Sequence, residues 1–83
     1  MQNLILTPFQ LAYYLKSRRK SLNLTQKQAG ELVGLLPKTV SALESHPERC
    51  SLESFFKLVS ALEIEMLLQP KPLPDEETEK DEW

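Results

Sequence analysis

The sequence predicts a small, mainly α-helical domain of four helices, followed by a short strand and an acidic tail. Three observations support this fold class. Apolar residues recur at helical spacing through most of residues 8–62, and capping boxes precede two of the helical stretches. The spacing changes at residues 64–69, where Ile64, Met66 and Leu68 occupy alternate positions, and the composition becomes rich in proline and acidic residues from residue 70. We therefore expect one domain over residues 1–69 and a flexible tail over residues 70–83.

The first two helices are predicted from their N-terminal signals. The segment TPFQ at residues 7–10 offers a capping threonine, a proline at the first helical position and a glutamine that completes a capping box. It predicts a helix that continues to about Ser21, and Asn23 favours the left-handed conformation that ends such a helix. The segment TQKQ at residues 25–28 is a second capping box and predicts a helix over residues 26–33.

Two glycines shape the connection to the third helix. Gly34 suits the left-handed residue that ends a helix. Gly30 lies in the middle of the second helix, where glycine costs roughly 1 kcal/mol relative to alanine, so a neighbouring element is expected to approach it very closely. Pro37 then opens a third helix that ends near Ser45. The two helices and their tight turn form a helix–turn–helix motif. Its predicted apolar seam consists of Ala29, Val33, Val40 and Leu43.

The fourth helix is predicted to begin after Ser51 and to continue to Leu62. Its predicted buried face consists of Leu52, Phe55, Phe56, Leu58, Val59 and Leu62. Beyond it, Ile64, Met66 and Leu68 occupy alternate positions, which predicts a short strand. The strand finds no partner within the chain, so we expect it to pair with the same strand of a second copy across a two-fold axis. The alternative is that the fourth helix continues to Leu68.

The charge is unevenly distributed along the 83 residues. The formal net charge is −2, but residues 1–46 carry +4 and residues 70–83 carry −4. Positive charge therefore lies in the half that contains the helix–turn–helix motif. The single Cys50, the lack of a signal-peptide pattern and the lack of a run of about 20 apolar residues predict a cytoplasmic protein with no membrane partner.

The sequence does not contain a pattern typical of catalysis, metal binding or cofactor binding. The single His46 lies beside Pro47 in a predicted loop, and Cys50 has no second cysteine or histidine at metal-ligand spacing. A glycine-rich phosphate loop is also absent. We expect a binding protein that is not an enzyme and needs no cofactor.

The predicted motif resembles the Cro/C1-type (Xre) helix–turn–helix family over about residues 10–62. The residues that carry the resemblance are Leu24, Thr25, Gln26, Ala29, Gly30, Val33, Gly34, Val40, Ser41 and Glu44. The family resemblance implies that the helix over residues 37–45 enters the DNA major groove with its N-terminus first. It also implies a structural ion pair between Arg19 and Glu44.

The same resemblance implies a set of DNA contacts. Base contacts are expected from Leu36, Lys38 and Ser41. Contacts to the DNA backbone are expected from Gln26, Lys27, Thr39, Arg18 and Lys20. Three of these residues have alternative roles, because Leu36 can be a core residue and Arg18 and Lys20 can be merely solvated.

Features outside the motif resemble the HipB-type antitoxins over nearly the full length. They are the segments TPFQLAYYLKSRRKSLNLTQ, LESFFKL and LEIEM, and an acidic tail that ends in Glu82 and Trp83. The resemblance implies a homodimer that binds operator DNA and represses its own promoter. It also implies a HipA-like serine/threonine kinase toxin as partner, or the equivalent in a three-component module with a third small subunit.

Trp83 is expected to dock on the toxin, since a terminal tryptophan is a large apolar anchor. The alternatives are that Trp83 marks the chain for degradation or belongs to an inert end. Two other functions are also compatible with the sequence. One is a stand-alone, phage-type repressor without a kinase partner, and the other is a helical adaptor that does not bind DNA.

Overall fold

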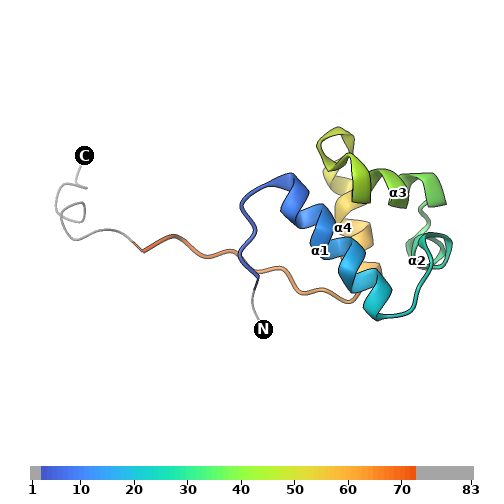
Figure 1. Cartoon of the computed structure of the whole chain (residues 1–83), viewed down its shortest axis with the longest axis horizontal. Coiled ribbons are helices and arrows are strands. Elements are labelled where there is room, and N and C mark those ends of the chain that lie inside the picture. The colour runs from blue at the N-terminus through green and yellow to red at the C-terminus, as the bar shows by residue number, and fades with distance from the viewer. Residues whose placement is uncertain (1–2, 73–83) are drawn as a thin grey trace.

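The computed structural model describes residues 3–72 and contains four α-helices and one short 3-10 helix (Figure 1). The elements are α1 (Pro8–Ser21), α2 (Gln26–Val33), α3 (Pro37–Ser45), η1 (Pro47–Arg49) and α4 (Leu52–Ala61). Helix α2 packs against both α3 and α4, and α1 packs against α3. After α4 the chain leaves the helical domain without regular secondary structure, as Figure 1 shows in orange. The four predicted helices are therefore confirmed.

Side-chain caps fix where three of the helices begin. The Thr7 and Thr25 hydroxyls accept hydrogen bonds from the backbone N–H groups of Gln10 and Gln28, at 3.1 and 3.0 Å. The two glutamines complete the capping boxes by accepting from the threonine N–H groups. Ser51 Oγ caps α4 in the same way. Each cap satisfies an N–H group that has no partner within its helix, so both predicted capping boxes are confirmed.

One apolar core holds the helices together. It consists of Leu15, Ala29, Val40, Leu43, Phe55, Leu58, Val59, Ala61 and Leu62. Three members of the predicted seam between α2 and α3 are fully buried here, and Val33 packs against the cluster from the edge. Two residues of the predicted α4 face are exposed instead, because Leu52 and Phe56 lie on the outer side of the helix. The prediction was wrong for these two.

The α2–α3 turn explains both glycines. A Cβ built on Gly30 would overlap the backbone carbonyl oxygen of Leu35 and would lie 3.3 Å from Val40 Cγ2. The expected close approach at Gly30 is thus confirmed, and the turn backbone comes closer than the α3 side chain. Gly34 has φ +76° and ends α2, and the N–H of Leu35 donates to the Gly30 carbonyl at 2.8 Å. This is the hydrogen bond of a left-handed helix cap.

The segment after α4 differs from both readings of the sequence. Helix α4 ends at Ala61, and Glu63 has a left-handed backbone with φ 55°, so the alternative of a helix continuing to Leu68 is wrong. Residues 64–69 form no strand in the single chain that the structure describes, because no neighbouring strand is present to pair with them. Residues 73–83 of the predicted tail lie outside the described residues.

Candidate nucleic-acid interface

The N-terminal end of α3 lies on the surface of the domain. Leu36 precedes the helix and is 60% exposed, which rules out the alternative that it is a core residue. Lys38 is exposed, while Thr39 and Ser41 are half-buried. The three predicted base-contact residues therefore lie on the first turns of one short helix. Apolar, cationic and hydroxyl groups at such an end can meet a thymine methyl, guanine O6/N7 and a base or phosphate oxygen, respectively.

The N-terminus of α2 supplies a second element of this interface. Lys27 is exposed and Gln26 is half-buried. The backbone N–H groups of the first turn have no acceptor within the helix, and together with the helix dipole they favour an anion. Thr25 uses its hydroxyl for the capping box, so its role is structural.

A buried hydrogen-bond network joins α1, α2 and α3 behind these two helix ends. Arg19 Nε lies 2.6 Å from Glu44 Oε2, and Arg19 Nη2 lies 3.0 Å from Glu44 Oε1. The Arg19 and Glu44 side chains are only 9% and 2% exposed. Arg19 Nη1 also donates to the Leu24 carbonyl at 2.8 Å. The bidentate pair thus fixes α1 to α3.

Glu44 also orients a residue of the candidate interface. Its Oε1 accepts a second hydrogen bond from Gln26 Nε2 at 3.1 Å. The pKa of Arg19 lies above its ordinary value, mainly because of the hydrogen bond to Glu44. Burial acts in the opposite direction, and the negative charge of Glu44 adds to the increase. Because Gln26 begins α2 and Glu44 lies near the end of α3, this carboxylate fixes the two helices of the motif to each other.

Two predicted backbone-contact residues on α1 have different surroundings. Arg18 is half-buried, and its guanidinium donates to the carbonyls of Leu62 and Glu63 at 3.0 and 3.4 Å. Lys20 is exposed. The Arg18 guanidinium is therefore engaged at the end of α4, which is a contact that neither prediction for this residue, a phosphate contact or a solvated charge, included.

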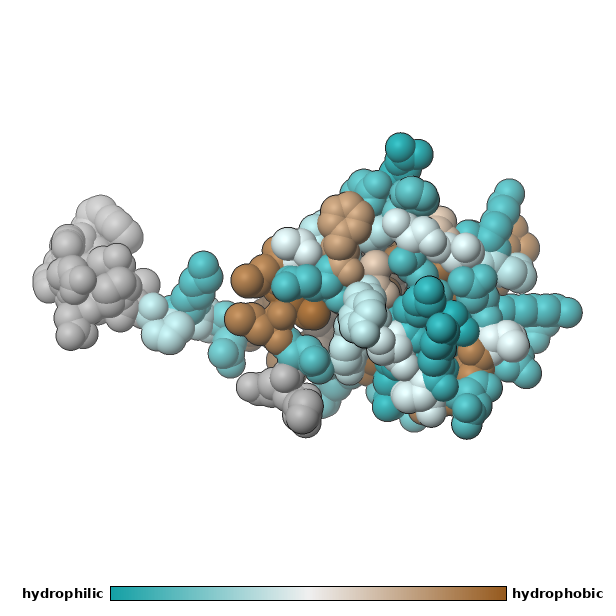
Figure 2. All heavy atoms as spheres, viewed as in Figure 1, coloured by the Kyte–Doolittle hydropathy of each residue, from teal (hydrophilic) through white to brown (hydrophobic). Residues whose placement is uncertain are grey.

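Hydrophilic and hydrophobic side chains are unevenly distributed over the surface (Figure 2). Hydrophilic side chains cover much of the domain, and hydrophobic side chains gather at the end from which the C-terminal segment departs. Among the predicted dimer-strand residues, Ile64 is half-buried against the core, whereas Met66 and Leu68 are exposed. Trp83, the predicted docking residue, lies outside the described residues.

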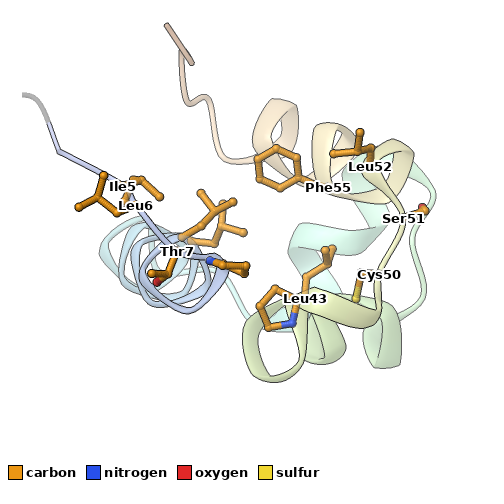
Figure 3. Close-up of a pocket in the computed structure, with 12 residues that line it drawn as sticks. Ile5, Leu6, Thr7, Leu43, Cys50, Ser51, Leu52 and Phe55 are labelled. Carbon is orange, nitrogen blue, oxygen red and sulfur yellow. The ribbon is translucent and has the colours of Figure 1, made fainter. Parts of the chain in front are cut away.

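An apolar groove lies between the start of α1 and the start of α4 (Figure 3). Ile5 and Leu6 line one side, Leu52 and Phe55 line the other, and Cys50 is the only ionisable side chain among the residues that form it. Within residues 3–72, there is no group of three His, Cys, Asp or Glu side chains that could hold a metal ion. Nor is any helix in that range long and apolar enough to cross a membrane.

Sequence reasoning missed two of these contacts. Arg18 and Leu62 are 44 positions apart, and Gln26 and Glu44 are 18 positions apart. Such pairs follow from how the helices pack, and local spacing gives no signal for them.

The fold and this pair of helix ends define a helix–turn–helix domain, and the helix–turn–helix family model matches residues 15–68. Two curated relatives make the family more specific. Antitoxin HipB of Escherichia coli K12 is 34% identical over 82 residues, which cover 95% of this chain and 93% of the relative. Antitoxin HipB of Escherichia coli O6:H1 is 36% identical over 64 residues, which cover 77% of this chain and 68% of the relative. The chain therefore belongs to the HipB antitoxin family.

Solved structures agree with this assignment. A chain of the HipA–HipB–O2–O3 complex superimposes with a TM-score of 0.81 at 31% identity and covers 86% of this chain and 100% of that chain. A chain of the HipB–O4 20mer complex gives the same values. A chain of the HipB–O1–O2 complex gives a TM-score of 0.79 at 32% identity, covering 83% of this chain and 100% of that chain.

Proposed function

We propose that this chain is the DNA-binding antitoxin subunit of a HipA-type toxin–antitoxin module, in a regulatory and not a catalytic role. The observation that carries the proposal is the match to antitoxin HipB over almost the whole of both chains, with the helix–turn–helix motif inside it. One similar solved chain comes from a complex of HipA with HipB, which supports a HipA-like serine/threonine kinase as partner. The proposal includes either a two-component module or a three-component module with a third small subunit.

In this proposal, α3 enters the major groove of operator DNA with its N-terminus first. Leu36, Lys38 and Ser41 contact base edges. Gln26, Lys27, Thr39 and Lys20 contact the phosphate backbone. Arg18 is left out of this set, because its guanidinium already donates to backbone carbonyls at the end of α4.

The proposed DNA-bound form is a homodimer in which residues 64–69 of two copies pair as strands across a two-fold axis. Met66, Leu67 and Leu68 are exposed in the single chain, and such a strand pair would cover apolar surface of this kind. A dimer also doubles the phosphate contacts and reads two half-sites about 34 Å apart. Occupancy of such an operator would repress the module's own promoter.

Lys38→Ala is expected to weaken binding to the DNA upstream of the gene by about 10- to 100-fold, because the variant loses one bidentate guanine contact or one phosphate contact. Lys57→Ala removes an equally charged exposed side chain from α4 and serves as the matched control, with no change expected. Fluorescence anisotropy on a labelled duplex at two salt concentrations measures both variants. If Lys38→Ala binds DNA as tightly as the control, the placement of α3 in the DNA interface is wrong.

We further propose that Trp83 docks on the kinase toxin. Trp83→Ala is expected to weaken the antitoxin–kinase complex by about 30-fold or more, in the range of aromatic hot-spot residues, and to leave DNA binding unchanged. Calorimetric titration of the purified kinase with each antitoxin measures the first effect, and the anisotropy assay measures the second. An unchanged affinity for the kinase would assign Trp83 to degradation or to an inert end.

A further inference from the structure

Three helices of this domain end in a left-handed residue, and one of those residues is of an unusual type. Asn23, Gly34 and Glu63 have φ values of 59°, 76° and 55° at the ends of α1, α2 and α4. Glycine has no Cβ to clash in this region, and asparagine adopts it often. Glutamate is disfavoured there. The end of α4 therefore needs support that the other two ends do not need.

Backbone hydrogen bonds close the end of α4, and a side chain binds the first two carbonyls beyond the helix. The N–H of Ile64 donates to the Val59 carbonyl, and the N–H of Glu63 donates to the Ser60 carbonyl, each at 3.1 Å. These two bonds are the double cap of a helix that ends in a left-handed residue. The carbonyls of Leu62 and Glu63 follow, and the Arg18 guanidinium of α1 binds both, at 3.0 and 3.4 Å.

These two carbonyls belong to the peptide groups on either side of the Glu63 Cα atom. Because each peptide group is planar, fixing both planes fixes the φ and ψ angles of Glu63. Those two angles set the direction in which residues 64–69 leave the domain. A guanidinium suits this position, since its fork can bind two acceptors at once and its positive charge is favourable at a helix C-terminus.

We propose that Arg18 is a positioning residue for the dimer strand: by holding the peptide planes around Glu63, it aims residues 64–69 toward the second copy. The inference rests on the proposed strand-paired dimer. A segment that already has the paired direction loses less conformational freedom when it pairs. Arg18 therefore strengthens dimerisation although it does not contact the second copy.

Sedimentation of the free protein over a concentration series tests this role without DNA. Arg18→Ala is expected to raise the dimer dissociation constant about tenfold, as for the loss of a hydrogen bond from a charged group. Arg18→Lys keeps the charge and most of the side chain but lacks the rigid, planar fork of donors that fits the two carbonyls, so it is expected to behave like Arg18→Ala. Lys16→Ala removes an exposed charge from the same helix and is expected to leave the constant within twofold of wild type.

A second substitution separates positioning from general stability. Adding Glu63→Asn to Arg18→Ala is expected to restore part of the dimer affinity, because asparagine adopts the left-handed conformation more readily than glutamate. Equal dissociation constants for Arg18→Ala and Lys16→Ala would overturn the inference, and so would the absence of rescue by Glu63→Asn. A monomeric wild-type protein would overturn the proposed dimer as well, whereas a dimeric wild type with an unaffected Arg18→Ala variant would overturn this inference alone.

Discussion

Glu44→Ala is expected to lower the free energy of unfolding by about 3–5 kcal/mol, the largest effect of any substitution considered for this domain. The variant leaves the Arg19 guanidinium buried with only the Leu24 carbonyl as a partner, because both carboxylate contacts are lost. Gln26 loses its acceptor at the same time. Such a loss is a large share of the stability of a domain of this size.

The same chain contains a matched control for this prediction. Glu53 and Lys57 form an exposed ion pair at 3.6 Å, with side chains 80% and 45% exposed. Solvent screens that pair, so Glu53→Ala is expected to cost below about 1 kcal/mol. Urea unfolding followed by circular dichroism at one fixed protein concentration measures both variants. A similar cost for the two substitutions would show that burial of the Arg19–Glu44 pair does not matter to stability.

Gly30→Ala is expected to destabilise the domain by about 2–3 kcal/mol, although alanine is the better helix former by roughly 1 kcal/mol. A methyl group at this position would overlap the Leu35 carbonyl oxygen and press on Val40, so the turn and α3 must move away from α2. The displacement would also misplace the N-terminal end of α3, and we expect DNA binding to weaken beyond the loss of folded protein.

The second glycine of the motif distinguishes steric overlap from backbone conformation. A Cβ added at Gly34 would have open space around it, and the φ of Gly34 is +76°. Glycine is therefore favoured at this position for its backbone conformation alone. Asparagine tolerates that conformation, and Gly34→Asn is expected to cost less than about 1 kcal/mol. Gly30→Asn is expected to be at least as harmful as Gly30→Ala. Equal costs for asparagine at the two positions would contradict this account of the turn.

The sequence was most informative where a short-range pattern had a single physical cause. The capping threonines, the left-handed Asn23 and Gly34, and the close approach at Gly30 were all predicted from neighbouring residues, and the structure confirms them. These features depend on one or two turns of backbone. The family resemblance extended the prediction to the pairing of Arg19 with Glu44, two residues that the structure places in direct contact.

Helical spacing was less informative about which side of a helix is buried. Leu52 and Phe56 have apolar side chains but are exposed, and Leu52 lines the apolar groove. An apolar residue is also placed on the surface where a second chain covers it, and sequence spacing cannot distinguish that case from burial within one chain. The same reason applies to residues 64–69, whose proposed strand pairing needs a second copy.

The role of Arg18 needed the structure. Four basic residues lie within residues 16–20. The family resemblance assigns Arg19 to the pair with Glu44, but the sequence offers no way to rank the other three as DNA contacts or internal contacts. Only the packing of α1 beside the end of α4 brings the Arg18 guanidinium to the carbonyls of Leu62 and Glu63. Because the Arg18 guanidinium binds these carbonyls, the exposed cations that remain in the proposed DNA interface are lysines.

Site-selective binding of the purified protein to its own upstream DNA tests the central claim most directly. The measurement compares that duplex with a scrambled duplex of equal length and composition, at 50 and 200 mM salt. The account predicts tight binding to the upstream duplex, weaker binding to the scrambled one, and a loss of affinity for both as salt rises, because phosphate contacts release counterions. Equal affinity for the two duplexes, or affinity that does not change with salt, would contradict the assignment of this helix–turn–helix as an operator-binding element.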